Sequence, residues 1–200
     1  VAIRLLAERG FESTSVGELA DAARISRSTF FRRFGTKEDV VFADHERLVE
    51  RLQAFLESSS HDLRDTVIAG ARMVLDHHLQ HPETSRLRWN LLRENPALRD
   101  RELVVTRRYE RTFAAHLERT VPLGTPEWAA PALAAAVVAV HNSVLRRWLR
   151  DPVLAAGPQL DRELGELLSR LGPAVEQASA SRAEDPEAVL EQISALLRRR

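Results

Sequence analysis

Apolar residues recur at intervals of three and four along almost the whole chain, and they almost never alternate with polar residues. This period places apolar side chains on one face of a helix, so the pattern predicts an all-α protein without strands. Glycine, proline, serine and aspartate residues between the periodic segments mark where the helices end. The expected helices cover residues 1–9, 15–23, 25–34, 37–57, 62–81, 82–93, 95–120, 126–150, 159–179 and 185–200.

Three segments carry finer expectations. Residues 37–57 are expected to form one continuous connecting helix, and residues 122–126 a loop. The helix that begins near residue 159 must kink or break at Gly172-Pro173, because proline lacks the N–H that a helix interior uses. Residues 177–183 are of low complexity and are expected to form a loose linker.

Residues 15–39 predict two short helices joined by a tight turn. Leu19, Ala20 and Ala23 form a small apolar face on the first helix, over which apolar side chains of the second can close. The whole chain has a formal net charge of zero, but no acidic residue occurs between Ala22 and Thr36. The exposed remainder of this segment is therefore basic, which suits a polyanion. Its basic and hydroxyl side chains are Arg24, Arg27, Ser28, Arg32, Arg33 and Lys37.

Together with its flanks, this segment resembles the DNA-binding domain of TetR-family transcriptional regulators. The matching segments are Ala7 to Phe11 with Thr14 and Val16, Leu19 to Ala23, Ile25 to Phe34, and Lys37 to Val40. The resemblance covers about the first quarter of the chain and is specific because many spaced positions agree at once. It implies a three-helix helix-turn-helix domain at residues 1–45 and a helical ligand-binding and dimerisation domain at residues 46–200.

The resemblance also implies a DNA interface. Residues near the start of the recognition helix (Arg27, Ser28, Thr29) are expected to face base edges, while Arg32, Arg33 and Lys37 hold phosphates. Thr14 and Ser15 are candidates both for phosphate contacts and for N-caps of the second helix. A basic, solvated helix on an ordinary bundle would be the alternative. The full expected interface is Thr14, Ser15, Arg24, Ser26, Arg27, Ser28, Thr29, Phe31, Arg32, Arg33 and Lys37.

Two residues depart from the family pattern. Arg24 stands where the family usually has a turn glycine, so we expect backbone strain or a different turn there. Phe31 stands where the family usually has a tyrosine, so a hydroxyl that could donate to a phosphate is missing.

The segment from Trp128 to Leu149 is apolar nearly all round and contains four alanines that let helices approach closely: Ala132, Ala135, Ala136 and Ala139. The resemblance implies that this helix and residues 160–175 form a four-helix bundle with a second subunit, which predicts a homodimer. One core helix of a monomer is the alternative, because small residues serve both uses.

A small-molecule effector of unknown identity is expected to bind between the middle helices, because several residues there combine bulk with polar tips. These candidates are Met73, Trp89, Tyr109, Phe113, His116 and His141. Core packing is the alternative for each of them. Arg86, Arg88 and Arg93 beside Trp89 could bind an anion, but their alternation with acidic residues favours a salt-bridged solvated face.

Other chemistry is not indicated. The chain has no cysteine, phosphate loop or nucleophile elbow, so we expect no enzyme activity and no cofactor. His77 and His81 share a helix face, but two imidazoles make an incomplete metal site, and helix-end histidines are the alternative. The longest apolar run, Trp128 to Val140, is shorter than the roughly 20 residues that span a bilayer. A cytoplasmic location is expected.

These observations predict a homodimeric transcriptional regulator that represses by binding a palindromic operator and is released by a small molecule. The alternative is a helical small-molecule or protein-binding module without operator binding.

Overall fold

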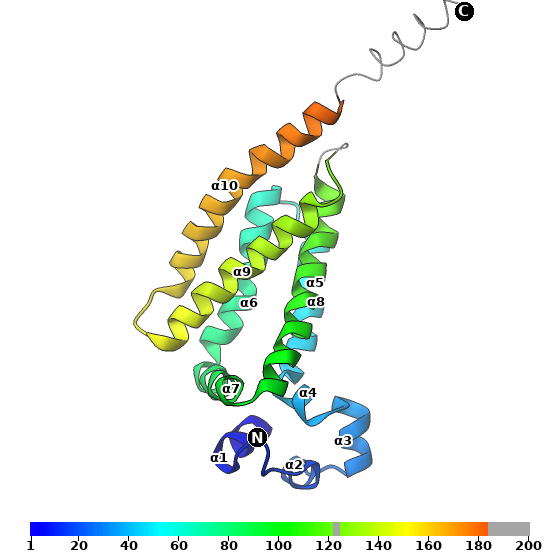
Figure 1. Ribbon diagram of the computed structural model, residues 1–200, viewed down its shortest axis with the longest axis vertical. Coiled ribbons are helices and arrows are strands. Elements are labelled where there is room, and N and C mark those ends of the chain that lie inside the picture. The colour runs from blue at the N-terminus through cyan, green and yellow to red at the C-terminus, as the bar shows by residue number, and fades with distance from the viewer. Residues whose placement is uncertain (122–124, 184–200) are drawn as a thin grey trace, which may run out of the picture.

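The computed structural model describes residues 1–121 and 125–183, with backbone alone over 172–183 (Figure 1). Within this part of the chain all regular structure is helical, which confirms the predicted all-α class. The helix expected at residues 185–200 lies outside the described residues, as do residues 122–124 of the expected loop.

Four short helices form a head at one end of the molecule (Figure 1): α1 (Ala2–Arg9), α2 (Val16–Ala22), α3 (Arg27–Phe34) and α4 (Lys37–Val41). Leu6, Leu19 and Phe30 meet in its core, each at most 1% exposed. Gly10 ends α1 with a φ of 88°, a conformation that glycine adopts without steric cost. The helices are too short to be stable alone, so this shared core is what holds them.

Six longer helices form the body: α5 (Ala43–Ser58), α6 (Leu63–Gln80), α7 (Pro82–Glu94), α8 (Pro96–Thr120), α9 (Ala129–Arg150) and α10 (Ala156–Ala183). Apart from α7, which crosses the end nearest the head, they run along the length of the molecule (Figure 1). The expected signals start several of them. Asp62 caps α6 by accepting a hydrogen bond from the backbone N–H of Asp65, and prolines occupy the first turns of α7 and α8.

The connecting helix is not continuous, so that prediction is wrong. It breaks at Phe42, whose φ of −116° and ψ of 13° are not helical, and α4 and α5 meet there. Phe42 is 6% exposed. At the break, Arg88 donates a hydrogen bond to the Val41 carbonyl. A local periodicity cannot reveal a partner that arrives from another helix.

The last two helices also differ from the expected ones. α9 begins at Ala129, three residues later than predicted, after a turn over residues 127–128. α10 begins at Ala156 and continues through Pro173 to Ala183, so the backbone shows neither the helix break at 172–173 nor the linker at 177–183. Elongating an existing helix needs no new nucleus, and Ala, Gln and Glu are good helix formers.

One helix of the described part, α9, is long and apolar enough to cross a membrane by length and composition, with a mean hydropathy of 1.3 over its most apolar window. The prediction counted only its uninterrupted apolar run. Leu133, Val137 and Val144 of this helix are at most 5% exposed, because they pack against the rest of the body. Such burial is what a core helix shows.

Candidate nucleic-acid interface and buried cavity

Side-chain caps fix the start of α2. The backbone N–H of Glu18 donates to Ser15 Oγ at 3.2 Å, and the Ser15 N–H donates back to Glu18 Oε2 at 2.8 Å. This capping box gives Ser15 the capping role that was one of its two expected roles. Thr14 is 1% exposed and donates its hydroxyl to the Gly10 carbonyl at 2.8 Å. Its side chain therefore lies inside the head and is not placed to meet a phosphate, contrary to the expectation.

The turn between α2 and α3 contains the strain expected from the sequence. Arg24 has a φ of 54° and is the only residue other than glycine with a positive φ within the described residues. The Arg24 and Ile25 N–H groups donate to the Asp21 and Ala20 carbonyls, both at 3.0 Å, which closes the turn. An L-residue pays a steric cost here that glycine avoids.

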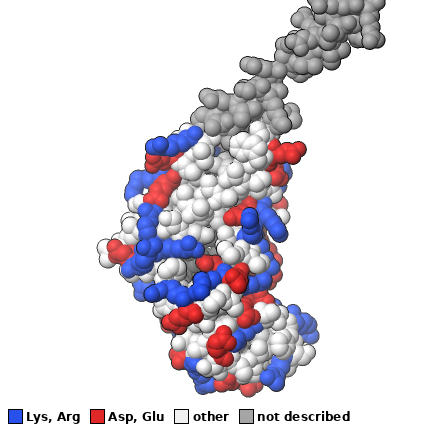
Figure 2. All heavy atoms as spheres, in the orientation of Figure 1, with Lys and Arg blue, Asp and Glu red and all other residues white. Residues whose placement is uncertain are grey.

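α3 is anchored on one side and bare on the other. Ser26 caps it by accepting a hydrogen bond from the Thr29 N–H at 3.1 Å. Phe30 is 1% exposed and packs against the rings of Phe31 and Phe34. The rest of its surface exposes Arg27, Ser28, Arg32 and Arg33, close in sequence to Arg24 of the turn, which is also exposed. Figure 2 shows basic side chains projecting at this end of the head.

The basic side chains of this surface have no acidic partners among residues 1–121 and 125–183. Elsewhere in the described chain most ion pairs engage arginine, yet none of the pairs found includes Arg24, Arg27, Arg32 or Arg33. Four neighbouring cations that lack carboxylates keep their charge available for an external anion. This surface lies where the sequence predicts the interface, and its DNA contacts stay a prediction.

Phe31 and Lys37, two further residues of the expected interface, differ in availability. Phe31 is 52% exposed, so an apolar ring stands in the basic surface. The Lys37 ammonium group instead turns inward, donating to the Phe11 carbonyl at 2.7 Å and lying 4.2 Å from the centre of the Phe11 ring. Its charge joins α4 to the end of α1, a role different from the expected phosphate contact.

A cavity of about 80 Å³, partly open to solvent, lies between α5, α6, α7, α8 and α9. Four of the predicted ligand residues line it: Trp89, Tyr109, Phe113 and His141. Met73 and His116 do not. Met73 lies in a separate surface groove with Arg72 and Asp76, and His116 is buried near the backbone of Leu56. Helix phase relative to neighbouring helices decides this, and composition does not reveal it.

Arg88 organises the cavity wall nearest the head. It is 5% exposed and donates to three groups of the α4–α5 junction: the Val41 carbonyl at 2.8 Å, His45 Nε2 at 3.0 Å and Asp44 Oδ1 at 2.5 Å. The sequence favoured a solvated face for this arginine, and that interpretation is wrong. A buried arginine is stable here because each of its three guanidinium nitrogens makes a hydrogen bond and Asp44 balances its charge.

The carboxylate of Asp44 is held ionised. Burial raises its pKa, but the hydrogen bond with His77 and the charge of Arg88 outweigh burial and keep the pKa well below its usual value. The His77 Nε2 atom lies 3.0 Å from Asp44 Oδ2. Asp44 therefore joins α5 to both α6 and α7.

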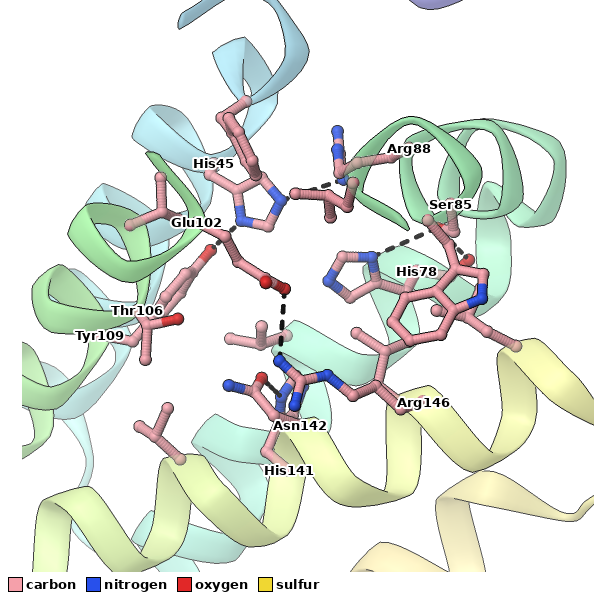
Figure 3. A pocket seen from close by; sticks show the side chains of 18 of the residues that line it. His45, His78, Ser85, Arg88, Glu102, Thr106, Tyr109, His141, Asn142 and Arg146 are labelled. Atoms are coloured by element: carbon pink, nitrogen blue, oxygen red, sulfur yellow. Dashed lines mark hydrogen bonds and ion pairs between the residues drawn. The ribbon is translucent and has the colours of Figure 1, made fainter. Parts of the chain in front are cut away.

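Three buried histidines follow one another along the cavity (Figure 3). The ring centres of His45 and His78 are 5.5 Å apart, and those of His78 and His141 are 6.3 Å apart. Burial lowers the pKa of His45 to about 3 and that of His141 to about 4, and it lowers the pKa of His78 well below 6.5. All three imidazoles are neutral at pH 7.

The three histidines at the C-terminal end of α6, His77, His78 and the capping residue His81, point in different directions. His78 Nδ1 lies 3.2 Å from Ser85 Oγ in the cavity wall, His77 contacts Asp44, and His81 Nδ1 lies 2.8 Å from the His77 carbonyl. No cluster of three histidine, cysteine or acidic side chains suited to a metal ion occurs among the described residues.

An ion pair between α8 and α9 borders the same cavity (Figure 3). Glu102 Oε1 and Arg146 Nη2 are 3.6 Å apart, and their side chains are 30% and 44% exposed. Together with Arg88 and Asp44, they leave no uncompensated charge among the cavity-lining groups described here.

Sequence reasoning missed His45, His78 and Arg88 as site residues. The available signal was position: His45 continues the buried stripe of Leu48, Leu52 and Leu56 at helical spacing. A polar residue inside an apolar stripe must be buried with partners, although the stripe does not identify those partners.

In the part of the chain that the structure describes, two ion pairs connect head and body. Arg4 of α1 contacts Glu83 of α7 at 2.5 Å, and Arg101 of α8 pairs with Asp39 of α4. Asp39 also accepts hydrogen bonds from the Thr36 N–H at 3.0 Å and from the Thr36 hydroxyl at 2.8 Å. The cap of α4 is thus attached to the body.

Comparison with known proteins adds independent information. Residues 1–43 match the family model for bacterial regulatory proteins of the tetR family, and residues 53–172, more than half of the chain, match that of the MftR C-terminal domain. The chain is 28% identical over 155 residues to a Mycobacterium tuberculosis protein assigned as the mycofactocin biosynthesis transcriptional regulator MftR, covering 76% of this chain and 77% of that protein. It is 30% identical over 101 residues to the regulator EthR of Mycolicibacterium smegmatis, 48% of this chain and 46% of EthR.

Solved structures agree with the fold. A TetR-family regulator from Streptomyces coelicolor superposes with a TM-score of 0.54 at 20% identity, covering 100% of this chain and 94% of that one. NalD, the secondary repressor of the MexAB-OprM efflux pump in Pseudomonas aeruginosa, gives a TM-score of 0.53 at 21% identity, covering 86% of this chain and 91% of NalD.

Proposed function

This chain belongs to the TetR family of bacterial transcriptional regulators, and we propose that it is a cytoplasmic homodimeric repressor released from a palindromic operator by a small molecule. DNA-binding regulation and the absence of enzymatic chemistry follow from the family. The operator contacts, the dimer and the release by a ligand are the proposal.

The observation that carries the operator contacts is the unpaired basic surface of α3. The exposed start of this helix, Arg27 with Ser28, reaches base edges, because the N-terminal end of a recognition helix enters the major groove. Arg32 and Arg33 lie nearer its C-terminal end and hold phosphates.

The dimer is supported by the outward face of α9. Ala132, Ala139 and Ser143 are exposed, Ala136 is half-buried between them, and all four follow one another at intervals of three and four. Figure 2 shows uncharged surface between charged side chains over this part of the body. Small residues on such a stripe allow a second helix to approach closely, so two α9 helices can pack across a two-fold axis. Two recognition helices then reach two half-sites.

Release is supported by the position of the cavity against the α4–α5 junction. Phe42 and His45 line the cavity, and Arg88 holds the Val41 carbonyl at the end of α4. A ligand that displaces these side chains changes the position of α4 on the body. Because residues 35–36 connect α4 directly to α3, the position of α3 changes as well. The effect on DNA binding equals the difference in the ligand's affinity for the two arrangements.

The test is fluorescence anisotropy of the full chain with fragments of the DNA upstream of its own gene, at two salt concentrations. Arg27→Ala should weaken the preferred site by about 1–3 kcal/mol and relax specificity, whereas Arg33→Ala should weaken all sequences similarly and reduce the salt dependence by roughly one released counterion. Arg111→Ala, which removes an exposed arginine of α8, is the matched control and should change neither.

Equal losses for Arg27→Ala and Arg33→Ala on every sequence would contradict the assignment of base and phosphate contacts. Weak, fully salt-sensitive binding without sequence preference would instead favour a helical binding module without an operator. Sedimentation of the complex should show two subunits for each site.

A further inference from the structure

The hydrogen-bonding roles in the cavity wall can be assigned because arginine is always a donor. Arg88 donates through Nη1 to His45 Nε2 at 3.0 Å, so this nitrogen carries no proton and His45 Nδ1 does. The proton on Nδ1 then points to Tyr109 Oη at 2.9 Å, and the tyrosine oxygen is the acceptor. The hydroxyl hydrogen of Tyr109 is left without an acceptor among the described residues.

The same reasoning applies to the other two histidines. The Ser85 hydroxyl donates to the His78 carbonyl at 3.2 Å, so Ser85 Oγ accepts from His78 Nδ1–H, also at 3.2 Å. His141 Nδ1 lies 3.2 Å from Asn142 Oδ1, an acceptor, and so carries the proton as well. Each ring therefore presents Nε2 as an acceptor. Nε2 of His141 is buried with no hydrogen-bond partner. The ring of His78 bonds through Nδ1, and its Nε2 forms no hydrogen bond with a described residue.

The cavity-lining residues thus include one unused hydroxyl donor and two unused imidazole acceptors, in surroundings that are otherwise mainly apolar. Trp89, Phe113 and Val138 supply part of the apolar wall. The charged groups are already paired, Arg88 with Asp44 and Arg146 with Glu102. A ligand with a charge would have to compete with one of these pairs or lie uncompensated among mainly apolar side chains, which is costly.

We infer that the effector is a small, uncharged and mainly apolar molecule that carries a hydroxyl group, which accepts from Tyr109 and donates to His141. A hydroxyl group has both a hydrogen and lone pairs, so it has the chemistry to accept from a tyrosine and to donate to an imidazole. The cavity volume of about 80 Å³ is enough for roughly five waters or one small ring. This inference rests on the proposed function, since it names the ligand class of the proposed repressor.

The experiment compares three probes by calorimetry and by tryptophan emission, which Trp89 in the cavity wall can report. p-Cresol carries the hydroxyl, p-xylene is nearly isosteric but lacks it, and benzoate carries a charge. We expect p-cresol to bind about tenfold or more tightly than either other probe, because the unused polar groups remain unpaired without it. A purely apolar cavity would prefer p-xylene, and an anion site would prefer benzoate.

Three variants locate the probe. Tyr109→Phe removes only the hydroxyl donor, and His141→Phe removes the acceptor; each should weaken p-cresol about tenfold and leave p-xylene nearly unchanged. His116→Phe is the matched control, because His116 is another buried histidine of the body with an unpartnered Nε2, but it lies outside the cavity lining. Circular dichroism of each variant checks that the fold is retained.

Preference for p-xylene or benzoate, binding of no probe up to its solubility limit, or equal effects of His141→Phe and His116→Phe would each overturn the inference. The DNA-binding test of the proposed function is run on the same protein without any probe. Operator binding without p-cresol binding therefore rejects only the ligand class, whereas p-cresol binding without operator binding rejects the proposed repressor and retains the assignment of the cavity.

Discussion

Replacing Arg88 by methionine tests whether the polar network between α7 and the α4–α5 junction stabilises the fold as described. Methionine keeps much of the side-chain volume but removes every donor. It would leave the Val41 carbonyl, His45 Nε2 and the ionised Asp44 without their partner in the interior. Arg88 itself is 5% exposed, so water cannot replace it without a structural change.

The expected size of the loss follows from these contacts. Removing one partner of a buried ion pair costs about 3–5 kcal/mol, because the other charge stays buried without compensation. The side chain of Asp44 is 30% exposed and keeps its contact with His77, so the loss should lie near the lower limit, about 3 kcal/mol. For a chain of this size that loss lowers the melting temperature by about 6–12 °C.

The assay is urea unfolding at pH 7, followed by circular dichroism at one fixed protein concentration, since dimerisation would make stability depend on concentration. Arg86→Met is the matched control: it removes an exposed arginine of the same helix, and its effect should stay within about 0.5 kcal/mol. Adding Asp44→Asn to Arg88→Met should recover about 1 kcal/mol or more, because the uncompensated carboxylate disappears. A loss below about 1 kcal/mol for Arg88→Met, or an equal loss for Arg86→Met, would refute the reasoning.

Three further outcomes are expected. Phe31→Tyr should tighten operator binding by about 1 kcal/mol in anisotropy measurements, because the exposed ring gains a hydroxyl that can donate to phosphate; unchanged affinity would mean that the ring does not lie near the DNA backbone. Arg24→Gly should raise the free energy of unfolding, measured in urea, by at most roughly 1 kcal/mol, because the relief of a steric cost of about 1–2 kcal/mol exceeds the entropy cost of glycine. A destabilised variant would contradict the strain at this residue. Because the folded state lowers the pKa of His45, His78 and His141, the unfolded chain binds more protons than the folded chain below pH 6.5. The free energy of unfolding in urea should therefore fall by about 1 kcal/mol for each histidine between pH 6.5 and 5.5. A stability that does not change with pH would show that these histidines are not buried as neutral rings.

The parts of the molecule that the sequence predicted well are those set by neighbouring residues. The ends of α6, α7 and α8 lie within a residue or two of the predictions, because Asp62, Pro82 and Pro96 act on the backbone beside them. The basic surface of α3 could be predicted equally well, because a run of residues without acidic side chains is found directly in the sequence. The strained turn at Arg24 followed from the same kind of comparison.

The parts that the sequence did not reveal depend on helices that meet from distant positions. Met73 and His116 are as large and as partly polar as Tyr109 and His141, yet only the latter pair lines the cavity. The rotation of each helix about its axis decides which of its side chains face the cavity. Arg88 resembles a solvated arginine until Asp44 and the Val41 carbonyl, more than forty residues earlier, are brought beside it.

By itself, then, the sequence determined the helices, the basic recognition segment and the family likeness, because hydrophobic period, caps and local charge act over a few residues. Only the tertiary structure decided that the connecting helix breaks at Phe42, that Arg88 is buried at this break, and which polar atoms in the cavity remain without partners. Hydrogen bonds and ion pairs in the interior are stable only where several helices supply donors, acceptors and charges at one point, and this coincidence exists in the folded chain alone.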